Sequence, residues 1–140
     1  MAIKAMNTIL RYTTGGDVTI GKLSNISCPE ISADTIDVTN HDNTDGYREF
    51  IQGLRDGGEV SCEGQLDSAD AGLALIYAHV NDDVNAGGVQ GLEIEYIDGS
   101  VLAFNAVCTG FKPGDAPVEG VVSFSASYKI TGKPTWTPAA

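Results

Sequence analysis

The chain has 140 residues, 42% of them apolar, and its 19 acidic residues against eight basic ones give a net charge of −11. This length is that of one domain with a core of its own, and the apolar fraction excludes global disorder. The shortage of lysine and arginine excludes the basic patch that binding to nucleic-acid phosphates or to anionic membranes requires. No stretch approaches the ~18 apolar residues that span a bilayer, and the first residues lack the apolar run of a signal peptide.

Three cysteines, Cys28, Cys62 and Cys108, lie far apart and show no CxxC spacing. Any disulfide scheme would leave one of them unpaired, and a zinc or thioredoxin-type site is unsupported. All three fall within strand-like runs, where a reduced cysteine acts as a small apolar side chain. We therefore expect buried thiols, a reducing compartment and no metal.

Strands are predicted over most of the first 66 residues. Short runs at 8–13 and 18–31 read as extended chain, with Pro29 indicating an edge or a bulge. Residues 33–39 alternate apolar and polar side chains with a period of two. The run 59–66 does the same, placing Val60 and Cys62 on one face and Glu59, Ser61, Glu63 and Gln65 on the other. That alternation is typical of a half-buried antiparallel strand.

Between these two strands lies a long polar stretch, residues 40–58, which we predict to be a loop. Loops of this length inside a compact domain are uncommon and are usually functional or disordered. Four apolar residues, Tyr47, Phe50, Ile51 and Leu54, argue against a plain flexible linker. The stretch is therefore expected to fold back on its own domain or to dock on a neighbour.

One helix is predicted at about 68–81. Asp67 or Ser68 can cap its start, and Asp70 suits the first turn beside the positive end of the helix dipole. Apolar side chains then recur at intervals of three and four residues, at Leu73, Ile76, Tyr77 and Val80. Such spacing gives one apolar stripe that covers part of a sheet.

Three further strands, at 92–97, 101–111 and 119–130, complete the predicted fold, and Asp98-Gly99 supplies a hairpin turn between the first two. Residues 132–140, with Pro134 and Pro138, are predicted to form an extended, mobile tail. The fold class is therefore mainly β: one domain over 1–131, an antiparallel sandwich or barrel flanked by one helix, with a long inter-strand loop.

Residues that could carry catalysis are scattered. His41 and His79 are not paired by spacing, and no nucleophile elbow or phosphate loop is present. Residues 41–46 echo a calcium loop, but the first and twelfth positions lack the required ligands, so polar turn chemistry is favoured. Glu93 and Glu95 share a strand face, which favours a solvated surface over a glycosidase acid pair. We predict no enzyme, no cofactor and no metal.

The segment from 36 to 64 carries a more specific pattern. It reads I-D-V-T-N-H-D at 36–42, D-G-Y-R-E-F-I at 45–51 and G-L-R-D-G-G-E-V at 53–60. This pattern resembles the tail-tube (major tail) proteins of long-tailed phages, and the helix and closing strands follow in the same order over nearly the whole chain. Tube proteins of related injection machines and gene transfer agents share the fold.

The resemblance implies a structural virion protein whose subunits form six-membered rings that stack into a tube through which DNA passes without specific binding. It implies that residues 40–58 contact the adjacent ring. The contact residues would be Asp42, Asp45, Tyr47, Arg48, Glu49, Phe50, Ile51, Leu54, Arg55 and Asp56. Its implied partners are further copies of the chain, a tape measure protein, a tail terminator and distal tail or baseplate proteins, with assembly in the host cytoplasm.

A conduit for a polyanion should repel it rather than bind it, because each bound phosphate would slow transit. Acidic and small polar strand faces suit such a wall, and we hypothesise an acidic lumen lined by some of Glu59, Ser61, Glu63, Gln65, Glu93, Glu95, Ser123, Ser125 and Ser127. Lys129 is an exception that a salt partner could neutralise.

A second class of function stays open, that of a β-sandwich module binding a small ligand or a carbohydrate. Such modules typically expose aromatic stacking platforms, and the single tryptophan here, Trp136, falls in the predicted tail. The acidity itself also has two explanations, since it serves either solubility alone or the function of the surface.

Overall fold

The computed structural model of the protein describes residues 6–13, 17–67, 69–81, 88–114 and 116–139. Within these residues the elements are β1 (Ile9–Tyr12), β2 (Val18–Thr19), β3 (Leu23–Ser27), β4 (Ser32–Asp37), β5 (Phe50–Asp56), β6 (Glu59–Gln65), α1 (Ala71–Val80), β7 (Val89–Glu95), β8 (Val101–Pro113) and β9 (Ser123–Thr137). In this part of the chain, no helix has the length and apolar character needed to cross a bilayer.

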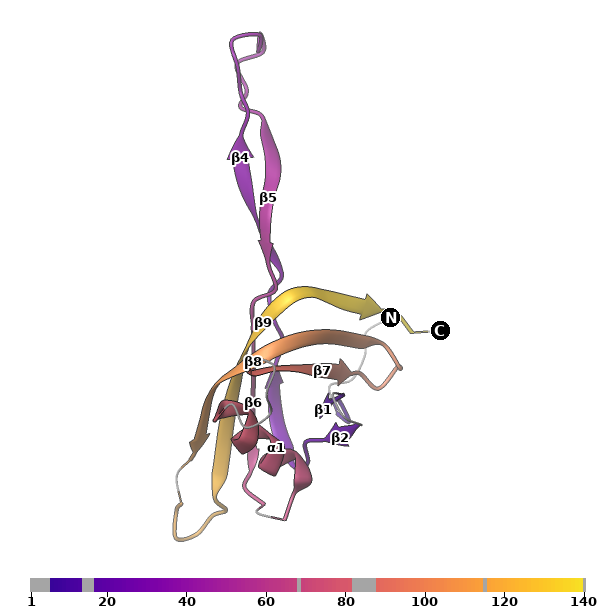
Figure 1. Cartoon of the computed structure of the whole chain (residues 1–140), viewed down its shortest axis with the longest axis vertical. Coiled ribbons are helices and arrows are strands. Elements are labelled where there is room, and N and C mark those ends of the chain that lie inside the picture. Colours follow the sequence, from indigo (N-terminus) through magenta and orange to yellow (C-terminus); the bar gives the residue numbers. More distant parts are fainter. Residues whose placement is uncertain (1–5, 14–16, 68, 82–87, 115, 140) are drawn as a thin grey trace.

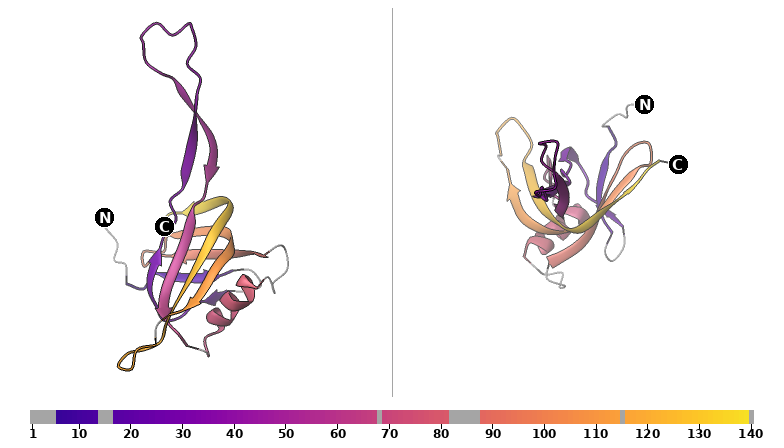
Figure 2. Two further views of the ribbon diagram at one scale, coloured as in Figure 1. Left: turned by 90° about the vertical axis from the view of Figure 1, so that its left-hand side faces the viewer. Right: turned by 90° about the horizontal axis from the view of Figure 1, so that it is seen from above.

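Seven strands form one antiparallel sheet in the order β2-β1-β7-β8-β9-β6-β3, and β4 and β5 form a separate two-stranded ribbon. The seven-stranded sheet curls strongly, with α1 packed against it, and the ribbon projects from one end of the body as a long arm (Figures 1 and 2). The predicted fold class, a mainly β antiparallel sandwich or barrel flanked by one helix, is confirmed, with the curled sheet forming a half-barrel.

The sheet has one apolar face, as the alternation in the sequence predicted. Every second residue of β6, of β7 and of β9 up to Ile130 is buried, while the residues between them are more exposed. The buried side chains form one core that also takes in α1 and the loop after β2: Leu10, Tyr12, Ile20, Val60, Cys62, Ile76, Leu92, Ile94, Leu102, Phe104, Ala106, Phe124, Ala126, Tyr128 and Ile130. This single cluster stabilises the body of the protein by removing apolar surface from water.

Helix α1 begins later than predicted. Its N-cap is Asp70, whose carboxylate accepts a hydrogen bond from the Leu73 amide at 3.2 Å, which satisfies a donor of the first turn. Asp67 instead accepts from the Ala69 amide before the helix, and Ser68 lies outside the described residues. The same Asp70 carboxylate accepts from the Gly21 amide at 3.2 Å and so ties the helix start to the chain after β2.

The buried face of α1 also differs from the predicted stripe. Gly72, Ile76 and His79 are buried, whereas Tyr77 is exposed. Gly72 is required at its position, since a Cβ there would lie 2.7 Å from the Cα of Ile20. The helix therefore buries the face that carries Gly72, because only this face allows the helix to lie so close to Thr19 and Ile20.

Beneath the helix, three buried polar side chains form a hydrogen-bonded chain. The Tyr12 hydroxyl lies 3.1 Å from His79 Nδ1 and 2.9 Å from the Tyr128 hydroxyl, and His79 Nε2 bonds the Gly88 carbonyl oxygen. Because a carbonyl only accepts, Nε2 carries the proton, and in a neutral ring Nδ1 accepts from Tyr12. Tyr12 in turn accepts from Tyr128. Burial raises the pKa of both tyrosines far above the ordinary value, so both hydroxyls stay protonated.

The end of the chain corrects the prediction of a tail from residue 132. β9 continues to Thr137, with Ala103 opposite Thr135 and Val101 opposite Thr137 on β8. The register shifts between Ala103 and Asn105, next to Gly132 with its φ of 82°. A bulge therefore lets the strand continue past Gly132 and Pro134, where the tail was predicted.

Candidate functional site

The most distinctive feature of the molecule is the arm, which we define as residues 30–58. β4 and β5 pair antiparallel along it, with Ile36 opposite Ile51 and Asp37 opposite Phe50, and a bulge lies between Ala33 and Thr35. Residues 50–56 are thus a strand, and the predicted loop over 40–58 is wrong for that part. The loop proper is shorter, and it forms the tip of the arm, far from the seven-stranded sheet (Figures 1 and 2).

Side-chain oxygens organise the tip. Asn40 accepts from the Asp42 amide at 2.9 Å, Asn43 from the Asp45 and Gly46 amides, and Asp45 from the Tyr47 amide at 3.0 Å. These are turns closed by short polar side chains, as predicted in preference to a calcium loop. Among the described residues no group of three His, Cys, Asp or Glu side chains is placed to hold a metal ion.

Apolar side chains stand on both faces of the arm without cover from the rest of the chain. Ile36 and Ile51 are directly opposite on one face, and Phe50 lies on the other. Tyr47 at the tip is 76% exposed and Leu54 near the base is 85% exposed. An isolated two-stranded ribbon is marginally stable in water, and an exposed apolar surface of this kind marks an interaction site.

The charged residues predicted to contact a neighbour are partly engaged within the chain. Arg48 lies 3.8 Å from Asp37, an exposed pair of little energetic weight. Arg55 donates to the Gln52 side-chain oxygen from two nitrogens, at 2.8 and 3.2 Å. The arm is acidic overall, since its acidic residues outnumber its basic ones. The acidic residues are Glu30, Asp34, Asp37, Asp42, Asp45, Glu49 and Asp56, and the basic ones are Arg48 and Arg55.

At its base the arm is fixed to the body by an ion pair. Lys129 Nζ on β9 lies 2.9 and 3.1 Å from the two carboxylate oxygens of Asp56, which also accepts from the Gly58 amide at 2.8 Å. The Gly58 amide first and Lys129 second lower the pKa of Asp56. Asp56 is thus the salt partner expected for Lys129.

Two glycines, Gly57 and Gly58, connect the arm to the body, and we call them the hinge; no role in the fold was predicted for them. A Cβ on Gly57 would lie 2.5 Å from Ile130 Cγ2, and one on Gly58, whose φ is 83°, would lie 2.5 Å from the Glu30 carbonyl oxygen. The available signal was the pair of adjacent glycines directly before a strong strand. Only glycine fits both the left-handed backbone and the close approach.

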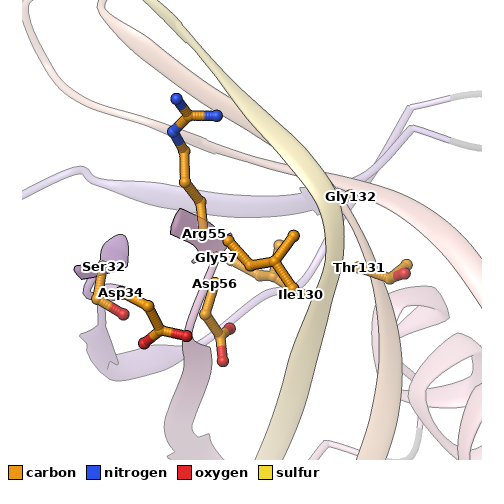
Figure 3. A pocket seen from close by; sticks show the side chains of 9 residues that line it. Ser32, Asp34, Arg55, Asp56, Gly57, Ile130, Thr131 and Gly132 are labelled. Atoms are coloured by element: carbon orange, nitrogen blue, oxygen red, sulfur yellow. The ribbon is translucent and has the colours of Figure 1, made fainter. Parts of the chain in front are cut away.

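A cleft of about 460 Å³ lies beside the hinge, between the arm base and β9. Figure 3 shows the carboxylates of Asp34 and Asp56 on one side of the arm base and the Arg55 guanidinium pointing away from them. Ile130 and Thr131 close the side formed by β9. With one carboxylate already bound to Lys129, the cleft offers no paired nucleophile and base of the kind that catalysis uses.

The predicted lumen-facing residues lie together on the sheet face opposite the core, which we call the polar face. The register of β6 and β9 sets Ser61 beside Ser127, Glu63 beside Ser125 and Gln65 beside Ser123. Glu93 and Glu95 alternate with the buried residues of β7, and they reach the same face through β8, where Ala103 opposes Glu93 and Val107 opposes Lys129. All nine of these residues therefore lie on one face of the sheet.

Cations on the polar face neutralise part of its acidity. Arg11 on β1 pairs with Glu93 at 2.9 Å and with Glu95, and Lys129 pairs with Asp56. The charged residues of this face are the acids Glu59, Glu63, Glu93 and Glu95 and the bases Arg11, Lys112 and Lys129. Between them lie serine, threonine and asparagine side chains, so the face is polar and only weakly acidic.

The three cysteines are free, but only two are shielded. Cys62 is buried and Cys108 partly buried, while Cys28 is exposed and its sulfur lies 3.0 Å from the Tyr96 hydroxyl. Burial raises the pKa of Cys62 to about 12. The expectation of buried thiols is therefore wrong for Cys28, which borders a groove of about 790 Å³ between β1 and β3.

Comparison with known protein families decides the class of the molecule. The model of the lambda phage tail tube protein family matches residues 13–137, which include the arm, the helix and every strand of the sheet except β1. The chain belongs to this family. No curated protein matches its sequence significantly.

Solved structures with the same fold come from a gene transfer agent, a contractile injection system and a phage tail. The tail of an empty gene transfer agent particle, determined with helical refinement and C6 symmetry, superposes with a TM-score of 0.75 at 19% identity, over 98% of this chain and 100% of that chain. The sheath/tube terminator of an extracellular contractile injection system gives 0.75 at 14% identity, over 99% and 98%. The SPP1 tail tube gives 0.70 at 14% identity, over 96% and 78%.

This tail tube protein therefore has a structural role in a phage tail or in a related injection particle or gene transfer agent. The membership favours the tube over the alternative of a carbohydrate-binding module. It also gives the arm and the polar face a context, since a tube needs contacts between subunits and a wall along its channel.

Proposed function

We propose that this tail tube protein forms hexameric rings and that the rings stack through the arm into a tube that conducts DNA. The arm is the observation that carries the proposal. It extends beyond the body, exposes apolar side chains on both faces, and is held at its base by glycines and an ion pair. A projecting ribbon of this kind is stable once a neighbouring subunit covers it.

Contacts to the adjacent ring would come from Tyr47, Phe50, Ile51 and Leu54, with charges from Asp42, Asp45, Arg48, Glu49 and Arg55 around them. The apolar residues would supply the affinity, because burying a side chain of this size stabilises by about 1.5–3 kcal/mol. Asp56 acts differently from the sequence prediction in this proposal: it orients the arm through Lys129 rather than touching the neighbour.

The polar face would line the channel. Its support is chemical: Arg11 and Lys129 are each held by carboxylates, and small neutral hydroxyls lie between them. Such a wall leaves few lysine or arginine side chains free to bind DNA phosphates. Little affinity from the release of counterions is therefore gained, and DNA is not retained. The proposed lumen is therefore weakly acidic and rich in hydroxyl groups.

The remaining partners follow from the same role. A tube of defined length would meet a tape measure protein inside it, a tail terminator at one end and distal tail or baseplate proteins at the other. Assembly would take place in the host cytoplasm. The role needs no catalysis.

Substitution of one exposed tyrosine tests the arm. Tyr47→Ser removes an aromatic side chain from the tip, and Tyr77→Ser removes one of similar exposure from the helix as a matched control. We expect Tyr47→Ser to stop assembly at single rings in sedimentation and negative-stain microscopy, while Tyr77→Ser still forms tubes. Normal tubes from the Tyr47 variant, and from a variant lacking residues 40–47, would refute the stacking role of the arm.

A further inference from the structure

The arm needs a surface to dock on, and its own body cannot supply one. It leaves the body along the longest axis of the molecule, and its tip lies far from every strand of the seven-stranded sheet (Figure 1). The apolar residues of the arm are therefore matched only by a surface on another molecule. That surface should be apolar, exposed and placed where an arm pointing along this axis can reach it.

A candidate lies at the opposite end of the body. The backbone amide of Leu66, just after β6, donates to the Val122 carbonyl oxygen at 2.8 Å, which places these two residues side by side. A turn closed by the Gly120 amide and the Pro117 carbonyl oxygen presents Val118, which is fully exposed. We call the four apolar residues here, Leu66, Val118, Val121 and Val122, the distal patch.

The distal patch and the arm face opposite ways along the same axis. The loop between β8 and β9 and the end of β6 lie at the bottom of the body in Figure 1, and the arm rises from the top. Figure 2 shows the same separation after a quarter turn about the vertical axis. One molecule placed above another in the same orientation thus sets an arm against a distal patch.

We propose that the distal patch is the site on a second copy of this chain that receives the arm. The inference rests on the proposed stacking function and names the surface that it uses. A contact between two different surfaces at opposite ends is heterologous, so every added copy offers the same free surface again and the assembly stays open. Contact between two distal patches would instead close a dimer and leave both arms uncovered.

The size of the expected effect follows from the chemistry of the contact. Val121→Asp places a carboxylate where the arm would exclude water, and a charge buried without a partner is strongly unfavourable. We expect the protein concentration needed for tube growth to rise on the order of tenfold to a hundredfold. Val121→Thr keeps the branched shape and serves as the conservative control, with a much smaller rise.

The decisive experiment mixes two defective proteins. Tyr47→Asp disrupts the contact surface of the arm and leaves the distal patch unchanged. Val121→Asp disrupts the distal patch and leaves the arm unchanged. Each protein alone should stop at single rings, with circular dichroism and a thermal melt verifying the fold. Mixed as preformed rings, they should give stacks of two rings and no longer tubes in negative-stain images and sedimentation.

The outcomes separate the inference from the function beneath it. Tubes from Val121→Asp and Val118→Asp at the wild-type concentration would overturn the distal patch, while stacking through the arm would stand. Two inactive variants that fail to form paired rings when mixed would also overturn it. A wild-type protein that never forms rings or tubes would instead overturn the proposed function.

Discussion

The buried chain of Tyr12, His79 and Tyr128 gives a quantitative prediction, because its members make different numbers of hydrogen bonds. Tyr12 sits in the middle and donates to His79 while it accepts from Tyr128, at 3.1 and 2.9 Å. Tyr128 lies at the end and donates only to Tyr12. Both side chains are almost fully buried, so water replaces neither bond.

Replacing each tyrosine by phenylalanine removes one hydroxyl but a different number of bonds. A hydrogen bond within a protein contributes about 1 kcal/mol net, and more where a buried partner loses its bond. Tyr12→Phe removes two bonds and should lower the free energy of unfolding by about 2 kcal/mol, whereas Tyr128→Phe removes one and should cost about 1 kcal/mol. The exposed Tyr77→Phe is the control and should stay within about 0.5 kcal/mol.

Urea unfolding below the concentration of assembly, followed by circular dichroism, measures these differences. With a slope of ~2 kcal/mol per molar urea, the midpoint should fall by about 1 M for Tyr12→Phe and by about half of that for Tyr128→Phe. Equal losses, or a larger loss for Tyr128→Phe, would refute the central position of Tyr12 in this chain of hydrogen bonds.

Three other predictions concern the arm base and the thiols. Gly58→Ala should lower the free energy of unfolding by more than about 1 kcal/mol and speed amide exchange in β4 and β5. Gly46→Ala is the control, because Gly46 has a similar positive φ but open space around it, and it should cost only the backbone strain of about 1 kcal/mol. Equal effects of the two substitutions would exclude a steric role for Gly58. The lowered pKa of Asp56 means that its contribution is complete above the unfolded value of about 3.9 and is lost as the pH falls through the lower folded value. The amide shift of Gly58 in NMR spectra should follow that loss, and Asp56→Asn should abolish the titration; a midpoint at or above the unfolded value would contradict it. A maleimide should label Cys28 in the native protein and Cys62 only after unfolding; labelling of both at one rate would show that the core is open.

The sequence predicted the body of the protein well because burial there alternates. β6, β7 and β9 up to Ile130 each have one face in the core, so apolar and polar residues alternate along them with a period of two. The helix was found for the same reason, and its cap at Asp70 shifted the start by a few residues. Gly72 and His79 were missed on its buried face because neither residue type is apolar in the usual sense.

The arm was harder to predict because it buries nothing in its own chain. Six of the seven residues of β5 are exposed, so no contrast between faces marks it as a strand. The resemblance to tail tube proteins located this segment, while its pairing with β4 became visible only in three dimensions. The ion-pair partners of Glu93, Glu95 and Lys129 could not be predicted, because Arg11 and Asp56 lie far from them in the sequence and only the fold brings them together.

A cryo-EM reconstruction of tubes grown from the purified protein tests the central claim most directly. The account predicts six subunits per ring, each arm seated on the adjacent ring, and the polar face with Ser61, Ser125 and Ser127 toward the channel. Tubes with this face on the outer surface, or rings joined without the arm, would contradict it.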